Sequence, residues 1–120
     1  MRDCHDALRS VISPMKRNST YKLHSQKDAI QDQTLVVAVK NQVSSILGQE
    51  AVILHLGKGE YYGLNEVGAV IWELLQKPIS AGQIASEVAR RFEVTDKQSR
   101  SDVLHLLNRL REANLIEIKE

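Results

Sequence analysis

The sequence predicts an α+β domain of winged-helix-like architecture, in which about three antiparallel strands are followed by three helices. Segments before Asn65 are rich in β-branched residues or alternate in the period-two pattern of strands. Segments after Asn65 carry apolar residues at the three- and four-residue spacing of amphipathic helices. Turn-forming residues separate these segments. A chain of 120 residues with 42% hydrophobic content suits one domain with a modest core.

Strand signals occupy residues 34–64. Thr34–Lys40 is rich in β-branched residues and is bounded by polar residues, which predicts a strand. Residues 41–48 are ambiguous, because they could extend that strand or line a loop. Glu50–Leu56 alternates with period two, and the short glycine-flanked link after it joins it to Glu60–Leu64 as a hairpin. The expected result is one small antiparallel sheet.

The first helix is expected from about Glu66 to Gln76, with Asn65 as its N-cap and Pro78 stopping it. Its apolar face has helical spacing. We expect Trp72, on this helix, to be largely buried against the sheet or the third helix, although an exposed tryptophan at a partner surface is the alternative.

Two further helices follow. Ser80 is the expected cap of the second, which runs to about Phe92. Thr95 begins the third with a capping box, because Gln98 follows three residues later, and that helix ends near Asn114. Residues 115–118 form a last strand or a tucked tail. The second and third helices have helix-turn-helix proportions.

Residues 1–33 differ in composition and are expected to be a flexible N-terminal extension to a domain that spans residues 34–120. The net charge of +1 gives no bulk attraction to nucleic acid or to an anionic membrane. No apolar run approaches the ~20 residues of a membrane span, and the N-terminus does not resemble a secretory signal. The expectation is a cytoplasmic protein with neither nucleic acid nor membrane as partner.

No catalytic or metal-binding pattern is evident, so we expect a binding module with no enzymatic activity, no cofactor and no metal. Cys4 lies in the extension, without a partner base or a pocket to activate it. None of the four histidines forms the i, i+4 pair of a helical metal site; they are His5, His24, His55 and His105. Gly57–Gly59 lacks the spacing of a phosphate-binding loop.

A DNA-binding regulator that uses the helix-turn-helix is the alternative function. The third helix carries basic residues that could contact phosphates; they are Lys97, Arg100, Arg109 and Arg111. Asp96, Asp102 and Glu112 on the same helix cancel most of that charge. These charges therefore favour a solvated face.

Residues 34–118 resemble the leader-peptide-recognition family founded by pyrroloquinoline quinone biosynthesis protein D. The resemblance is carried by Gly-Glu-Tyr-Tyr-Gly-Leu-Asn-Glu-Val-Gly at residues 59–68 and by Ile-Trp-Glu-Leu-Leu at residues 71–75. The segment ending at Phe92 and the apolar pattern of residues 102–115 are also typical. The Tyr-Gly-Leu-Asn run looks most like the stand-alone leader-binding proteins of lasso-peptide clusters. Asn114 departs from the usual glycine, and the long extension is a second departure.

The resemblance implies that an extended leader peptide adds to the edge of the sheet and lies against the third helix, which is β-augmentation. The candidate peptide-binding residues on the strand are Tyr61, Tyr62, Gly63 and Leu64. Those on the helix are Asp102, Val103, Leu106, Leu107 and Arg109. Val103 and Leu107 would equally be core residues in any winged helix, whereas a solvated face would not need Asp102 and Arg109.

The implied function is a leader-binding adaptor that delivers a ribosomally made precursor peptide to processing enzymes. In lasso-peptide systems the implied partners are a leader-cleaving cysteine protease and an ATP-dependent ring-forming synthetase, and in the quinone system a radical enzyme. A transcription regulator and a purely structural interaction domain stay open as other function classes. The sequence names neither the precursor nor the oligomeric state.

Overall fold

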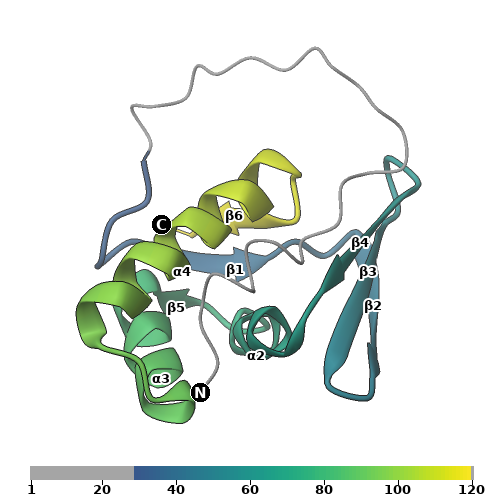
Figure 1. Cartoon of the computed structure of the whole chain (residues 1–120). Coiled ribbons are helices and arrows are strands. Elements are labelled where there is room, and N and C mark those ends of the chain that lie inside the picture. Colours follow the sequence, from purple (N-terminus) through teal and green to yellow (C-terminus); the bar gives the residue numbers. More distant parts are fainter. Residues whose placement is uncertain (1–28, 120) are drawn as a thin grey trace.

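A computed structural model describes residues 29–119, so most of the expected N-terminal extension, residues 1–28, lies outside the described residues. Within this range the chain is α+β, with two antiparallel sheets and three helices (Figure 1). The strands are β1 Leu35–Ala38, β2 Gln42–Leu47, β3 Glu50–His55, β4 Glu60–Leu64, β5 Ile79–Ser80 and β6 Ile116–Ile118. The helices are α2 Glu66–Leu74, α3 Ala81–Phe92 and α4 Asp96–Glu112.

The first sheet has the strand order β2-β3-β4. Residues 41–48, ambiguous from the sequence, contain β2, which pairs with β3 from Gln42 opposite His55 to Leu47 opposite Glu50. The hairpin predicted from the β3 and β4 segments is confirmed, with Ala51 opposite Leu64 in its register. The sheet has the expected three strands, but its first strand is β2 and not the Thr34–Lys40 segment that the sequence indicated.

The single-sheet expectation is wrong for the Thr34–Lys40 segment, because β1 belongs to a second sheet of order β5-β1-β6. The residues at the end of β1 are hydrogen-bonded to segments far away in the sequence. Ala38 N–H donates to the Leu75 carbonyl at 2.8 Å, and Val39 N–H donates to the Leu115 carbonyl at 3.0 Å. Residues 116–118 are the last strand rather than a tucked tail.

The helix starts are set by the expected caps. The side chain of Asn65 accepts from Gly68 N–H at 3.0 Å, and Ser80 with Gln83 forms a capping box before α3. Thr95 Oγ1 accepts from Gln98 N–H at 3.1 Å at the start of α4. These bonds satisfy amide groups that a helix leaves free in its first turn.

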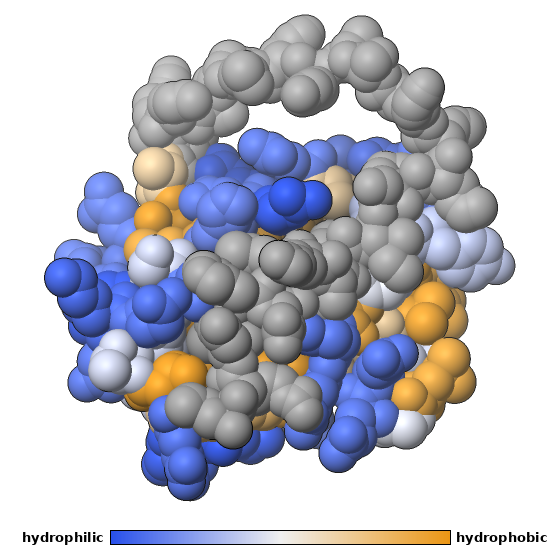
Figure 2. All heavy atoms as spheres, viewed as in Figure 1, coloured by the Kyte–Doolittle hydropathy of each residue, from blue (hydrophilic) through white to orange (hydrophobic). Residues whose placement is uncertain are grey.

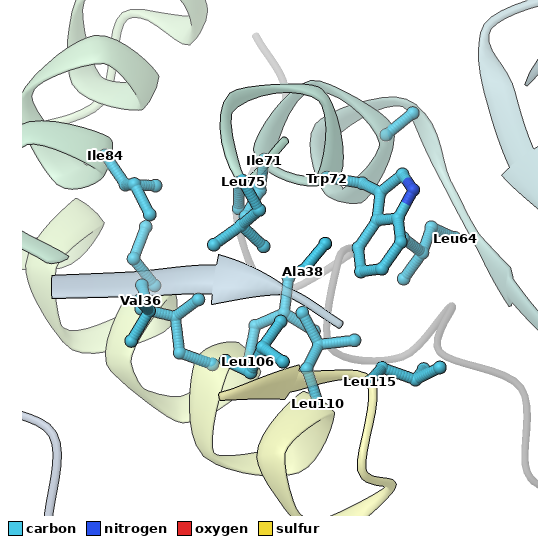
Figure 3. Close-up of a cluster of buried hydrophobic side chains, with 14 of the residues drawn as sticks. Val36, Ala38, Leu64, Ile71, Trp72, Leu75, Ile84, Leu106, Leu110 and Leu115 are labelled. Atoms are coloured by element: carbon cyan, nitrogen blue, oxygen red, sulfur yellow. The ribbon is translucent and has the colours of Figure 1, made fainter. Parts of the chain in front are cut away.

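The core lies where the helices meet both sheets, and Figure 3 shows side chains of α2, α3, α4 and β1 converging there. Trp72 is 2% exposed, which confirms its expected burial, and its indole N–H donates to Ser44 Oγ of β2 at 3.1 Å. Ile30 is also in this core, 5% exposed, four residues before the expected domain start. In Figure 1, α2 lies between the β2-β3-β4 sheet and α3.

Candidate functional site

Strand β4 is one edge of its sheet, because among the described strands only β3 pairs with it. The direction of its backbone groups follows from the register. Leu56 N–H donates to the Asn41 carbonyl at 3.0 Å, so these two facing residues form a hydrogen-bonded pair. Antiparallel partners alternate between bonded and non-bonded pairs, so every second residue of β3 faces β2 and the others face β4.

It follows that Tyr62 and Leu64 bond to β3, where they lie opposite Ile53 and Ala51. The backbone N–H and C=O groups of Tyr61 and Gly63 then point away from β3, towards the free edge. These are the donors and acceptors that an added strand would use.

The side chains of β4 divide between the two faces of the sheet. Tyr62 and Leu64 point into the core, at 3% and 2% exposure, whereas Tyr61 on the opposite face is 50% exposed. Gly63 lies on the face of Tyr61 and is buried. A glycine within a strand places no side chain in the way of another backbone that approaches closely.

A polar cluster fixes the end of β4 next to the β3–β4 turn. The Tyr62 hydroxyl donates to Glu60 Oε1 at 2.7 Å, and Glu60 is itself buried. Burial of the phenol raises the pKa of Tyr62 well above its usual range, and the Glu60 carboxylate raises it further. Lys58 Nζ lies 4.0 Å from Glu60 Oε1 and donates to the Ala113 carbonyl at 3.3 Å. The turn of this hairpin is thereby tied to the C-terminal end of α4.

The candidate residues of α4 differ in how far they reach the surface. Asp102, Arg109 and Ala113 are spaced seven and four residues apart, so they lie along one flank of the helix. Arg109 is exposed, whereas Asp102 is 5% exposed and accepts from Gln98 Nε2 at 2.9 Å. The structure therefore places the Arg109 cation at the surface, and the Asp102 carboxylate, two turns earlier, is buried and already bonded to Gln98.

Val103, Leu106 and Leu107 are 0–1% exposed and belong to the core cluster. In this conformation they support the flank from below and offer no surface to a ligand. The core interpretation that the sequence left open for Val103 and Leu107 is thus the one that their burial favours.

Two residues that hold the candidate site in place were not among those selected from the sequence. Glu60 precedes the predicted strand residues and holds the Tyr62 hydroxyl, and Lys58 reaches α4 from the turn. A polar residue that begins an otherwise apolar strand was the available signal for Glu60. The Lys58 contact joins residues 55 positions apart, so no local pattern could indicate it.

His55 is buried, and one of its ring nitrogens is engaged by the backbone. It is 6% exposed, and its Nδ1 accepts from Lys58 N–H at 3.1 Å. The described part of the chain contains no cluster of three or more metal-ligating side chains. None of the helices in this part of the chain is both long enough and apolar enough to cross a membrane.

Comparisons with known proteins bear on the family and the fold of the chain. The family model for "Coenzyme PQQ synthesis protein D (PqqD)" matches residues 50–116, from β3 to β6. The structure of TbiB1 in complex with the TbiA(beta) leader peptide is 30% identical, with a TM-score of 0.64 over 68% of this chain and 94% of TbiB1.

A second similar structure is the PqqD truncation of Methylobacterium extorquens PqqCD, a stand-alone recognition element for ribosomally synthesised and post-translationally modified peptides. It has a TM-score of 0.63 over 74% of this chain and 95% of that one. At 14% identity this match supports the fold alone. None of the curated protein sequences matches the chain significantly.

Proposed function

The chain belongs to the coenzyme PQQ synthesis protein D (PqqD) family, and from this premise we propose that it is a non-catalytic adaptor for a ribosomally made precursor peptide. The leader segment of the precursor binds as an extra strand along β4. The observation that carries the proposal is the free edge of β4, where the backbone groups of Tyr61 and Gly63 point away from β3.

Strand addition suits this edge physically. Backbone hydrogen bonds to Tyr61 and Gly63 supply affinity for any extended peptide, and side chains that alternate along the peptide supply selectivity. The exposed ring of Tyr61 gives the added strand an apolar neighbour on the outer face. Gly63 allows the two backbones to approach closely.

The flank of α4 supplies the second wall of the site. Arg109 is exposed there and is suited to a carboxylate or a carbonyl of the leader, because its guanidinium offers several donors. Asp102 is held by the bond from Gln98 one turn earlier in the same helix, while Val103, Leu106 and Leu107 anchor the helix in the core. Tyr62 and Leu64 serve the site by anchoring β4 to the core.

The finer assignment is to lasso-peptide biosynthesis. Its support is the Tyr-Gly-Leu-Asn run of residues 62–65 together with the 30% identity to TbiB1, whose structure contains a leader peptide. In this assignment the adaptor presents its precursor to a leader-cleaving cysteine protease and to an ATP-dependent ring-forming synthetase. No observation in α4 favours the DNA-binding alternative.

The proposal is tested by titrating a synthetic leader peptide, taken from a precursor encoded next to this gene, into the full chain by calorimetry. Tyr61→Pro removes an outward N–H from the β4 edge, and proline is tolerated at such edge positions. We expect this variant to raise the Kd at least tenfold while the circular dichroism spectrum stays that of the wild type.

Ile46→Pro is the matched control, because Ile46 also points its N–H outward but on the opposite edge of the sheet. Its leader affinity should equal that of the wild type. A folded Tyr61→Pro variant that binds the leader as tightly as the wild type would refute strand addition at β4.

A further inference from the structure

The opposite edge of the same sheet, strand β2, is unusually open and apolar. Among the described strands only β3 pairs with β2. Val43, Ile46 and Leu47 are 55%, 58% and 60% exposed. None of the six residues of β2 is charged. Figure 2 shows hydrophobic residues gathered on the side of the molecule where β2 and β3 lie.

Edge strands of stable monomers usually carry a charge, a proline or a bulge that prevents pairing with another chain. β2 has none of these in its sequence Gln-Val-Ser-Ser-Ile-Leu, and it pairs with β3 in continuous register. The hydrogen-bonded pair of Asn41 and Leu56 also determines which backbone N–H and C=O groups of β2 point away from β3. Val43, Ser45 and Leu47 bond to β3, so Ser44 and Ile46 direct their backbone groups outward.

We propose that the occupant of this edge is a second copy of the chain, paired antiparallel through β2 about a two-fold axis at Ser45. In this register Ser44 of each copy lies opposite Ile46 of the other, and each such pair exchanges both N–H···O bonds. The two three-stranded sheets then form one continuous six-stranded sheet.

The side chains of β2 are complementary to themselves in this register. Val43 of one copy lies opposite Leu47 of the other, twice, and Ser45 lies opposite its own equivalent at the axis. These are non-hydrogen-bonded pairs, in which facing side chains approach most closely. Apolar pairs and facing hydroxyls both stabilise a sheet, and no charge meets its own copy.

The side chains on the opposite face of the sheet also favour pairing with a second copy of the chain. Ser44 and Ile46 point to the face that α2 covers, and Ser44 contacts Trp72 of α2. Ile46, two residues on, is more than half exposed because the described helices do not cover it. In the two-fold register the Ile46 side chains of the two copies are diagonal neighbours, so each covers part of the other.

The contact is small, which sets its strength. A six-residue strand is about 20 Å long, and its edge with the flanking side chains buries on the order of 500 Å² per copy. Stable interfaces bury about 800 Å² per partner. The dimer should therefore be weak and depend on concentration. It leaves both β4 edges free, so it does not depend on the proposed function.

Sedimentation equilibrium of the full chain, from a few micromolar to several hundred, tests the inference. We expect the mass to rise from that of one 13.5 kDa chain towards twice that value. Ser45→Lys places like charges opposite each other at the axis and should raise the dimer Kd at least tenfold. Ser86→Lys, the same change at an exposed serine of α3, should leave it unchanged.

Mixing Ser45→Lys with Ser45→Glu tests the register itself, because opposite charges then meet at the axis. The mixture should recover dimer that neither variant forms alone. A wild-type chain that stays monomeric at several hundred micromolar would overturn the inference. So would a Ser45→Lys dimer as tight as the wild type, or a mixture that stays monomeric.

Discussion

Replacing Tyr62 with phenylalanine removes one hydroxyl from the base of the β4 edge without changing the apolar ring. That hydroxyl donates to Glu60 Oε1 at 2.7 Å, and both residues are buried. A hydrogen bond to a charged group contributes about 1.5–3 kcal/mol. Lys58, at 4.0 Å from the same oxygen, offsets part of the loss. We therefore expect the free energy of unfolding to fall by about 2 kcal/mol.

Urea denaturation at pH 7, followed by circular dichroism, measures this loss as a lower midpoint with an unchanged slope. The matched control is Tyr61→Phe, which removes the same hydroxyl from the neighbouring residue, 50% exposed. It should change the unfolding free energy by less than about 0.5 kcal/mol. A Tyr62→Phe variant as stable as this control would refute the role assigned to the Tyr62–Glu60 bond.

The same pair predicts a dependence on alkaline pH. The pKa of Tyr62 is raised in the folded chain, first by burial and then by Glu60, whereas a tyrosine of the unfolded chain ionises near pH 10. Above about pH 10 the unfolded state loses a proton that the folded state keeps, so the free energy of unfolding falls as the pH rises. This fall should be shallower in Tyr62→Phe than in the wild type, and equal slopes would contradict it.

Three further outcomes test other contacts. Trp72 is the single tryptophan, so the folded chain should emit to the blue of free tryptophan, and an emission maximum like that of the free amino acid would contradict its burial. Ser99→Ala removes a buried hydroxyl that donates to the Ala85 carbonyl at 2.7 Å, and it should cost about 1 kcal/mol in urea denaturation. Asn114 has a φ of 63°, so Asn114→Ala should lower the thermal midpoint by the equivalent of about 1 kcal/mol, and Asn114→Gly should not.

Local rules predicted much of this fold because the features they describe are local. The caps at Asn65, Ser80 and Thr95 each join residues three positions apart, and the β3–β4 hairpin joins neighbours along the chain. The partner of β1 is different. The two edges of β1 are bonded to residues near positions 80 and 117. Nothing in the sequence of β1 itself therefore indicates which of the two sheets it joins.

In the candidate site, too, local features were predictable from the sequence and long-range packing was not. The sequence of residues 60–64 predicted a strand but did not separate its two tyrosines, of which Tyr62 is buried and Tyr61 is half exposed. On α4, helical spacing could not separate residues that line a surface from those that lie under it. Leu106 is fully buried and Arg109 is exposed, although they are three residues apart. Only the packing of the helix against the rest of the core decides which is which.

The pairing of β1 with β6 also has a consequence for the order of folding. Val36 lies opposite Ile118, so this sheet closes a loop that spans nearly the whole described chain. Contacts that distant form late, because the entropy of closing the loop must be overcome first. During synthesis the β2-β3-β4 sheet can form while residues 116–118 have yet to be made. β1 must meanwhile wait with an open edge, which makes this strand the point at which a nascent chain is most exposed to mispairing.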